Sequence, residues 1–125
     1  MCATYYARTS DHGYETCAEH LAMAGCLAGG FAKGFGYLDD GLLAGLVHDL
    51  GKYSDAFQRR IRNPDHCGPV DHSTAGALLL MRHVCPLAAM AVAGHHAGLP
   101  DLGSYGELEG STFMSRMNRA RRAGD

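Results

Sequence analysis

Histidine is the residue type whose placement in this chain could do chemistry. The 125 residues include eight histidines but only two lysines. Two histidines adjoin at positions 95–96, and others stand beside aspartate, among them His48-Asp49 and Asp71-His72. Imidazole nitrogens and carboxylate oxygens together are typical ligands of divalent transition metals. The pattern therefore indicates a metal centre assembled from separate segments.

The His48-Asp49 pair is expected at the end of an apolar helix, with Gly51 and Lys52 just after it. Neighbouring residues on a helix project about 100° apart. A His-Asp pair at a helix end can therefore face two metals, and the two oxygens of Asp49 make it the natural bridge between them.

Each feature also has an ordinary structural explanation when taken alone. His20, in the middle of the first predicted helix, is most simply a half-buried, hydrogen-bonded side chain. Lys52 is most simply a solvated charge that interacts favourably with the helix dipole. The order and spacing of the whole set are much harder to attribute to chance.

The order of these motifs resembles the HD nuclease domain of the CRISPR-associated helicase–nuclease of type I systems, a branch of the HD phosphohydrolase superfamily. The resemblance extends over about residues 5–103. The His48-Asp49 pair alone would indicate only the broad superfamily. The blocks DHSTAGALLL and GHHAGLPD narrow the resemblance to the CRISPR branch. The blocks are HLAMAG around His20, AGLVHDLGKYSDAFQ through Gln58, DHSTAGALLL and GHHAGLPD.

The resemblance implies an all-α, compact helical HD-domain fold that holds one or two divalent transition metal ions, namely Mn, Fe, Co, Ni or Zn. By the same correspondence, Asp49 would bridge the metals and Lys52 would lie near the scissile phosphate, so these two are the candidate catalytic residues. The metal ligands implied are His20 and His48 for one ion, His72, His95 and His96 for the second, and Asp49 for both.

The function implied is a metal-dependent nuclease that cleaves single-stranded DNA in CRISPR interference. Its partners would be a separate or fused helicase and the RNA-guided surveillance complex, with no membrane. Two alternatives stay open: an HD phosphohydrolase that acts on nucleotides, and a metal-binding but catalytically incomplete HD domain. A plain helical domain with satisfied histidines is the remaining possibility. The histidines that match no ligand position are interpreted as structural or exposed: His12, His66 and His83.

The C-terminal end departs from the family. Family members have a further aspartate on a later helix, which completes the first metal site. Asp101 belongs to the GLPD turn and Asp125 is terminal, so neither is a convincing equivalent. The two interpretations are a C-terminally truncated domain and an incomplete first metal site. We therefore expect weak nuclease activity and regard the second metal site as the more secure.

Composition predicts one domain over residues 1–125. Charged residues make up 19% and the net charge is −2, which gives no general attraction to nucleic acid. Residues 1–115 hold 7 basic against 12 acidic side chains, whereas 116–125 hold four arginines and one aspartate. The basic tail, within 111–125, is most simply a solvated helix face, with a phosphate contact as the alternative. The sequence shows no export signal, no apolar run of about 20 residues and no C-x-x-C pair, so we expect a cytoplasmic protein with reduced thiols.

Apolar residues recur at intervals of three or four, which predicts five or six helices and no strand. The first helix would bury a face that runs from Tyr14 to Phe31. Helices are expected over 14–33, from Asp39 or Asp40 to Gly51, from Ser54 through Ile61, from Asp71 or Ser73 through Val84, from Pro86 to His95, and over 111–122, with loops at 63–70 and 97–110.

Overall fold

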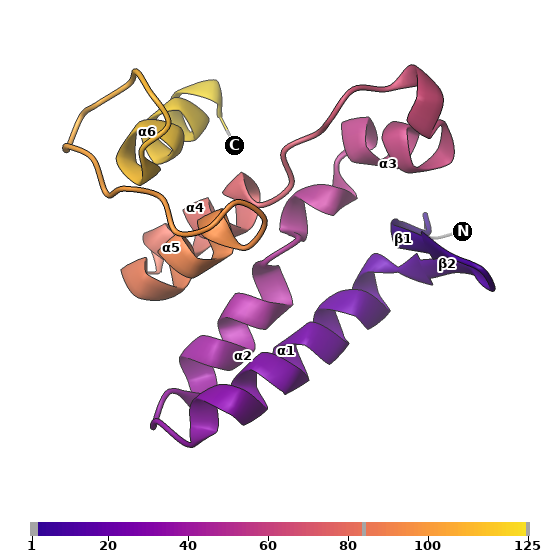
Figure 1. The fold of residues 1–125 in the computed structure, drawn as a ribbon, viewed down its shortest axis with the longest axis horizontal. Helices are drawn as coiled ribbons and strands as arrows, with labels where there is room; N and C mark the ends of the chain where they lie inside the picture. The colour runs from indigo at the N-terminus through magenta and orange to yellow at the C-terminus, as the bar shows by residue number, and fades with distance from the viewer. Residues whose placement is uncertain (1–2, 84, 125) are drawn as a thin grey trace.

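The computed structural model describes residues 3–83 and 85–124, so Val84 and Asp125 lie outside the described residues. The chain is mostly helical, as expected, but it begins with a small β-hairpin (Figure 1). The helices are α1 (Cys17–Lys33), α2 (Leu38–Val47), α3 (Asp55–Arg62), α4 (Thr74–Arg82), α5 (Pro86–Gly94) and α6 (Phe113–Ala123), with short 3-10 helices η1 (Leu50–Tyr53) and η2 (Pro64–His66).

The hairpin of β1 (Tyr6–Ser10) and β2 (Gly13–Thr16) corrects the expectation of an all-α chain. Its tight turn uses Gly13 at a φ of 118°, a backbone conformation that residues other than glycine rarely adopt. Cross-strand pairing of the Tyr6 and Tyr14 rings, with centroids 4.7 Å apart, supports the register. These local pairs stabilise strands that contain few of the β-branched residues typical of a sheet.

The first helix begins at Cys17, three residues later than predicted. Thr16 and Glu19 form a capping box, in which each side chain bonds the backbone N–H of the other residue. This cap fixes the helix start and leaves Tyr14 in β2. The predicted apolar face is also wrong at its far end, because Phe31 is 77% exposed.

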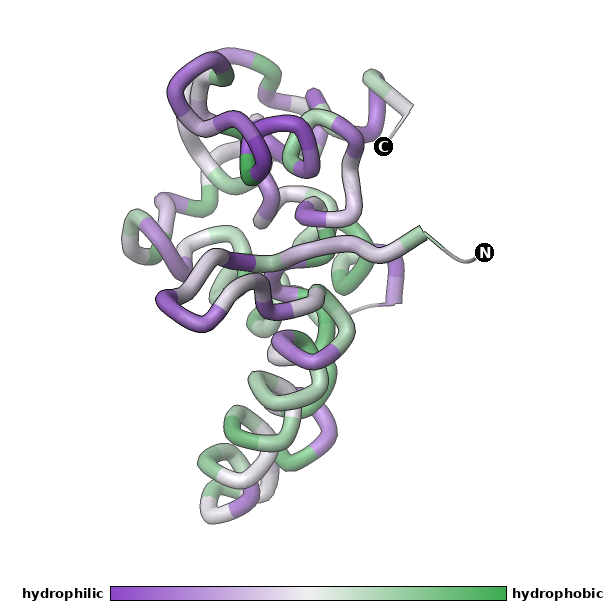
Figure 2. Tube along the Cα trace, turned by 90° about the vertical axis from the view of Figure 1, so that its right-hand side faces the viewer, coloured by the Kyte–Doolittle hydropathy of each residue, from purple (hydrophilic) through white to green (hydrophobic). Residues whose placement is uncertain are grey.

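Helices α1 and α2 form an antiparallel hairpin that projects from the rest of the molecule and is mostly hydrophobic in sequence (Figure 2). The helices approach closely at Gly45, where an added Cβ would lie 2.6 Å from the Cα of Gly25. The glycines at this crossing therefore let the two helix backbones approach closely. No helix among the described residues is long and apolar enough to cross a membrane.

The main hydrophobic core lies where α4, α5 and α6 pack together. Pro86 occupies the first turn of α5, and Ser54 caps α3 by accepting a hydrogen bond from the N–H of Phe57, both as predicted. The core residues are Ala77, Leu78, Leu80, Ala89, Val92, Ala93, Phe113, Met117 and Ala120.

The segment after α2 is held against the segment before α4. Helix α2 ends at Val47, so the prediction that it continues to Gly51 is wrong. Gly51 instead lies in η1, where its N–H donates to the His72 carbonyl at 3.1 Å. A Cβ on Gly51 would lie 2.6 Å from the Cα of His72, and a Cβ on Gly76 would overlap the Val47 carbonyl. Both close contacts require glycine, and they bring His72 to the end of α2.

Candidate metal centre

Asp49 lies at the centre of the histidine cluster. It follows His48, the residue that ends α2, and its side chain is only 4% exposed. Side chains from α1, from the end of α2, from the segment before α4 and from the end of α5 surround its carboxylate. The structure thus brings the six predicted ligand residues together: His20, His48, Asp49, His72, His95 and His96.

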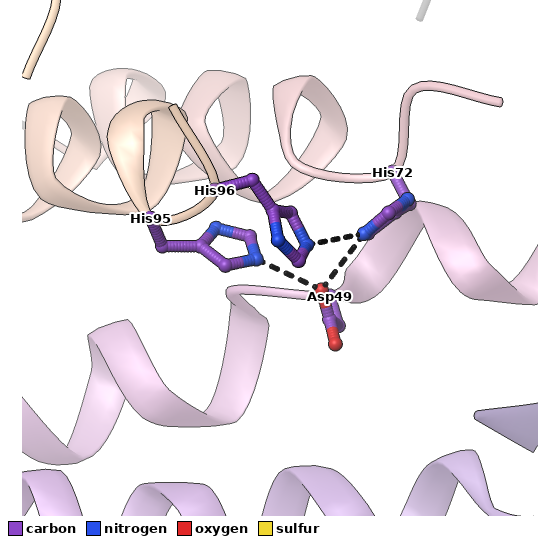
Figure 3. Close-up of side chains that lie close together, drawn as sticks. All are labelled: Asp49, His72, His95 and His96. Carbon is purple, nitrogen blue, oxygen red and sulfur yellow. Dashed lines mark hydrogen bonds and ion pairs between the residues drawn. The ribbon is translucent and has the colours of Figure 1, made fainter. Parts of the chain in front are cut away.

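One group, which we call the Oδ1 set, comprises Asp49, His72, His95 and His96 (Figure 3). Nε2 of His95 lies 3.2 Å from Oδ1 of Asp49, and Nε2 of His72 lies 3.5 Å from it. Nε2 of His96 is 2.7 Å from Nε2 of His72. The candidate ligand atoms all lie within 4.8 Å of one another. Three imidazoles and a carboxylate suit a divalent transition metal.

The second group, the Oδ2 set, comprises Asp49, His20 and His48. Nε2 of His20 and Nε2 of His48 lie 2.9 and 3.1 Å from Oδ2. The ammonium of Lys52 is closer still, at 2.6 Å, and its side chain is 11% exposed. The interpretation of Lys52 as a solvated helix charge is therefore wrong, because the lysine is buried against the carboxylate.

Backbone carbonyls orient three of the imidazoles. A carbonyl oxygen can only accept a hydrogen bond, so the ring nitrogen facing it, Nδ1, carries the proton. In a neutral ring of His72 or His95 this leaves the lone pair of Nε2 facing Asp49, as in metal-binding histidines whose second nitrogen donates to a carbonyl. Nε2 of His48 instead donates to Oδ2 of Asp49. The Nδ1–oxygen distances are 2.8 Å from His48 to Gly45, 2.7 Å from His95 to Val92 and 3.0 Å from His72 to Val70.

The fourth imidazole, His20, has a carboxylate in the same position. Oε2 of Glu15 lies 3.3 Å from Nδ1 of His20, while Nε2 of that ring faces Asp49. Glu15 belongs to β2, and the sequence analysis missed both the strand and this residue. The strand–helix junction brings the two side chains together, and no sequence spacing known to us signals that contact.

Oδ1 of Asp49 is buried and lacks a hydrogen-bond donor among the described residues. The nearest ring nitrogens, on His72 and His95, face it with lone pairs when the rings are neutral. An unsatisfied buried polar group costs about 1–3 kcal/mol, and more when it is charged. A cation placed between these atoms would remove that cost. The residues therefore fit a metal ion, which the Oδ1 set could hold.

The carboxylate is ionised. Burial alone would raise the pKa of Asp49, but hydrogen bonds from His48 and Lys52 outweigh burial and hold that pKa well below its usual range. The same hydrogen bond raises the pKa of His48. By contrast, burial together with the neighbouring His95 and His72 lowers the pKa of His96. His96 thus reaches its neutral, ligating form at a lower pH than an ordinary histidine.

Gln58 and Phe57 contact the segments that surround the cluster. The Gln58 side-chain amide donates to the carbonyl of Lys52 at 2.8 Å and to that of Tyr6 at 2.9 Å, and its oxygen accepts from the Tyr6 N–H. The Phe57 ring packs beside both Lys52 and His72. Gln58 lies in the block that carries the family resemblance, yet its role as a link to the β-hairpin depends on a strand that the sequence did not indicate.

The histidines that match no ligand position, His12, His66 and His83, are exposed and lie outside both groups, in agreement with their interpretation as non-ligands. The histidine–aspartate cluster therefore stands on its own geometry as the candidate functional site. Searches of protein-family models, of curated proteins and of solved structures found nothing that matches this chain.

Proposed function

We propose that this chain is a metal-dependent phosphodiesterase that cleaves single-stranded DNA, as the HD nuclease domains that it resembles do. The observation that carries the proposal is the buried Asp49 carboxylate, whose Oδ1 has no donor in the described part of the chain and faces the imidazoles of His72 and His95. This geometry supports bound metal, and the order of the motifs supports the reaction class.

Divalent ions held at such a site would act as Lewis acids on a phosphoryl oxygen and would activate water for attack on phosphorus. The chain's own residues supply the remaining elements. The carbonyl partners keep each Nε2 aimed at Asp49, which holds the imidazoles in their ligating orientation. Lys52 places a positive charge beside Oδ2, where it can neutralise charge on a neighbouring phosphoryl oxygen.

The preference for single strands follows from access to Asp49. Its carboxylate is buried, so the scissile phosphate has to reach a recessed point on the surface. A single strand is flexible enough to do so, whereas duplex DNA has a persistence length of about 150 base pairs and resists local bending. Arg119, Arg121 and Arg122 on the exposed side of α6 offer few phosphate contacts. We therefore propose that a partner helicase and an RNA-guided complex deliver the strand.

The test is a cleavage assay on the purified chain with circular single-stranded DNA, the matched duplex and mononucleotides, each with Mn²⁺, Co²⁺ or Ni²⁺. We expect weak cutting of the single strand only, abolished by a chelator and by Asp49→Ala. His66→Ala, which changes an exposed histidine outside the cluster, is the matched control and should cut like the wild type. Metal-independent cutting, or hydrolysis of mononucleotides in place of DNA, would contradict the proposal.

One observation favours a second candidate, a metal-binding domain without nuclease activity. The Lys52 ammonium already neutralises Oδ2 of Asp49, which disfavours a second cation at that oxygen. This candidate predicts one ion per chain and no cleavage of any substrate in the same assay. Cleavage that requires two ions per chain would exclude it.

A further inference from the structure

Arg116 does not lie on the solvated face of α6 where the sequence places it. Its side chain is 23% exposed and points at the ends of two other helices. One terminal nitrogen, Nη1, donates to the carbonyl of Ala93 at 2.9 Å. The other, Nη2, donates to the hydroxyl of Thr74 at 2.8 Å and to that of Ser73 at 3.1 Å. The guanidinium therefore joins α6 to the end of α5 and to the start of α4.

Both partner segments carry metal-ligand candidates. Ser73 and Thr74 directly follow His72 in the chain, while Ala93 lies two positions before His95. A single planar group thus spans the two segments that supply every imidazole of the Oδ1 set. A guanidinium has its donors in a fixed plane and direction, so it sets the spacing of two acceptors in a way that a single ammonium does not.

The Ala93 contact also completes the end of α5. The last carbonyls of a helix have no partner within the helix and need donors from elsewhere. The carbonyl of Val92 accepts from Nδ1 of His95, and the carbonyl of Gly94 accepts from the N–H of Gly98 at 2.7 Å. Arg116 satisfies the carbonyl between them. The helix end that orients His95 is thereby closed by a residue from α6.

The contacts at the start of α4 form a second fixed point. The Asp71 carboxylate accepts hydrogen bonds from the N–H groups of Ser73 and Thr74, and it lies 3.6 Å from Nη2 of Arg116. The turn that contains His72 is therefore held from both of its sides. Within the described part of the chain, the hydrogen bonds and ion pair of Arg116 reach only these two segments and not those of His20 or His48.

From these contacts we infer that Arg116 is a positioning residue for the Oδ1 set, fixing the distance between His72 and the His95-His96 pair. The inference rests on the proposed metal centre for its effect on affinity, although the positioning itself exists without metal. It also makes Arg116 a poor candidate to bind DNA phosphate, because both of its terminal nitrogens bond within the chain.

The experiment compares Arg116→Gln and Arg116→Lys with Arg119→Gln in the full chain. Arg119 is the matched control: it lies three residues further along α6 and donates from one nitrogen to the carbonyls of Leu108 and Gly110, away from the cluster. The first readout is the long-range ¹H–¹⁵N correlation spectrum of the histidine rings without metal. The second is Co²⁺ affinity, measured by calorimetry together with the visible spectrum of the bound ion.

Both Arg116 variants should shift the ring signals of His72, His95 and His96. They should also weaken Co²⁺ binding by roughly tenfold or more, the loss typical when a residue that orients metal ligands is changed. Arg119→Gln should leave both readouts unchanged. Wild-type signals and affinity in Arg116→Gln would overturn the inference, as would an equal loss in Arg119→Gln. If the wild type binds no Co²⁺, the metal centre fails, and the metal-free spectra still decide the positioning role.

If Arg116→Gln does not fold, a second variant tests the same inference. Thr74→Val keeps the shape of the side chain and removes one hydroxyl that Arg116 binds. We expect its ring signals to shift most at His72, and unshifted signals would overturn the inference.

Discussion

The two oxygens of Asp49 face different surroundings, although each is flanked by histidines. Oδ2 lies 2.6 Å from the Lys52 ammonium and near His20 and His48, so its charge is already neutralised. Oδ1 faces Nε2 of His72 and Nε2 of His95 and has no hydrogen-bond partner among the described residues. A carboxylate between two ligand sets therefore need not bind a metal ion equally well through each of its oxygens. The side without a resident cation gains most from a metal ion.

This difference gives the two sets an order of binding. The Oδ1 set is expected to take the first ion, and the Oδ2 set the second and weaker one, because there an ion must displace or share the contact with Lys52. The residues that position the ligands also differ between the two sets. Arg116 links the segments of the Oδ1 set, whereas Glu15 supports His20 alone.

Loss of Asp49 should have the largest effect, because it is the one residue that belongs to both sets. Asp49→Ala should abolish binding of both ions, a loss greater than the roughly 100-fold that removal of an outer partner can cause. Asp49→Asn keeps the size of the side chain and should also lose both ions. Metal per chain after gel filtration checks this. Retention of both ions by Asp49→Ala would contradict the central place of Asp49.

The histidine substitutions separate the two sets. His95→Ala should empty the Oδ1 set and remove the thermal stabilisation by metal, which amounts to about 2.7 kcal/mol at a metal concentration 100 times the dissociation constant. His20→Ala should leave the first ion bound and weaken only the second. Thermal melts with and without Co²⁺ or a chelator measure both effects. If His20→Ala emptied both sets while His95→Ala emptied neither, the order of binding would be reversed.

Removal of the Glu15 carboxylate should act on one set alone. Glu15→Gln takes the negative charge away from Nδ1 of His20, which lowers the basicity of that ring and should weaken the second ion by about tenfold. The exposed Glu109→Gln serves as the matched control, with no expected change. Calorimetric titration with Co²⁺ resolves the two steps. An equal loss at both steps would mean that the sets do not bind independently.

One substitution is expected to raise the metal affinity. Lys52→Met keeps the apolar stem of the side chain but removes the ammonium that competes for Oδ2. A charge-assisted hydrogen bond contributes about 1.5–3 kcal/mol, so binding of the second ion should tighten by roughly tenfold or more. Cleavage of single-stranded DNA should fall in the same variant, because a positive charge beside the phosphate is lost. Weaker binding of the second ion would show that Lys52 supports the site and does not compete with metal.

Two ligand residues could be predicted from local sequence because they sit at helix ends, whereas the full ligand set was implied by the family resemblance. His48 and His95 each follow an apolar helix, and in each case the imidazole bonds a carbonyl of the last turn, a contact that local geometry sets. Ser54 before α3 and Pro86 in α5 were predictable for the same reason, since a cap or a proline acts on the adjacent turn.

The supporting residues could not be predicted, because their partners are distant in the chain. Arg116 bonds Thr74, 42 positions away, and Gln58 bonds Tyr6 across 52 positions. In the sequence, Arg116 belongs to a basic run whose simplest interpretation is a solvated face. The exposed Phe31 shows the opposite error, because an apolar residue at helical spacing need not have a partner.

The claim that the Oδ1 set binds the first ion is tested most directly by crystals of the chain grown with one equivalent of Co²⁺. An anomalous difference map locates the ion without reference to activity. We predict one strong peak among Oδ1 of Asp49 and the Nε2 atoms of His72, His95 and His96. A peak between His20 and His48, or no peak at Asp49, would contradict it.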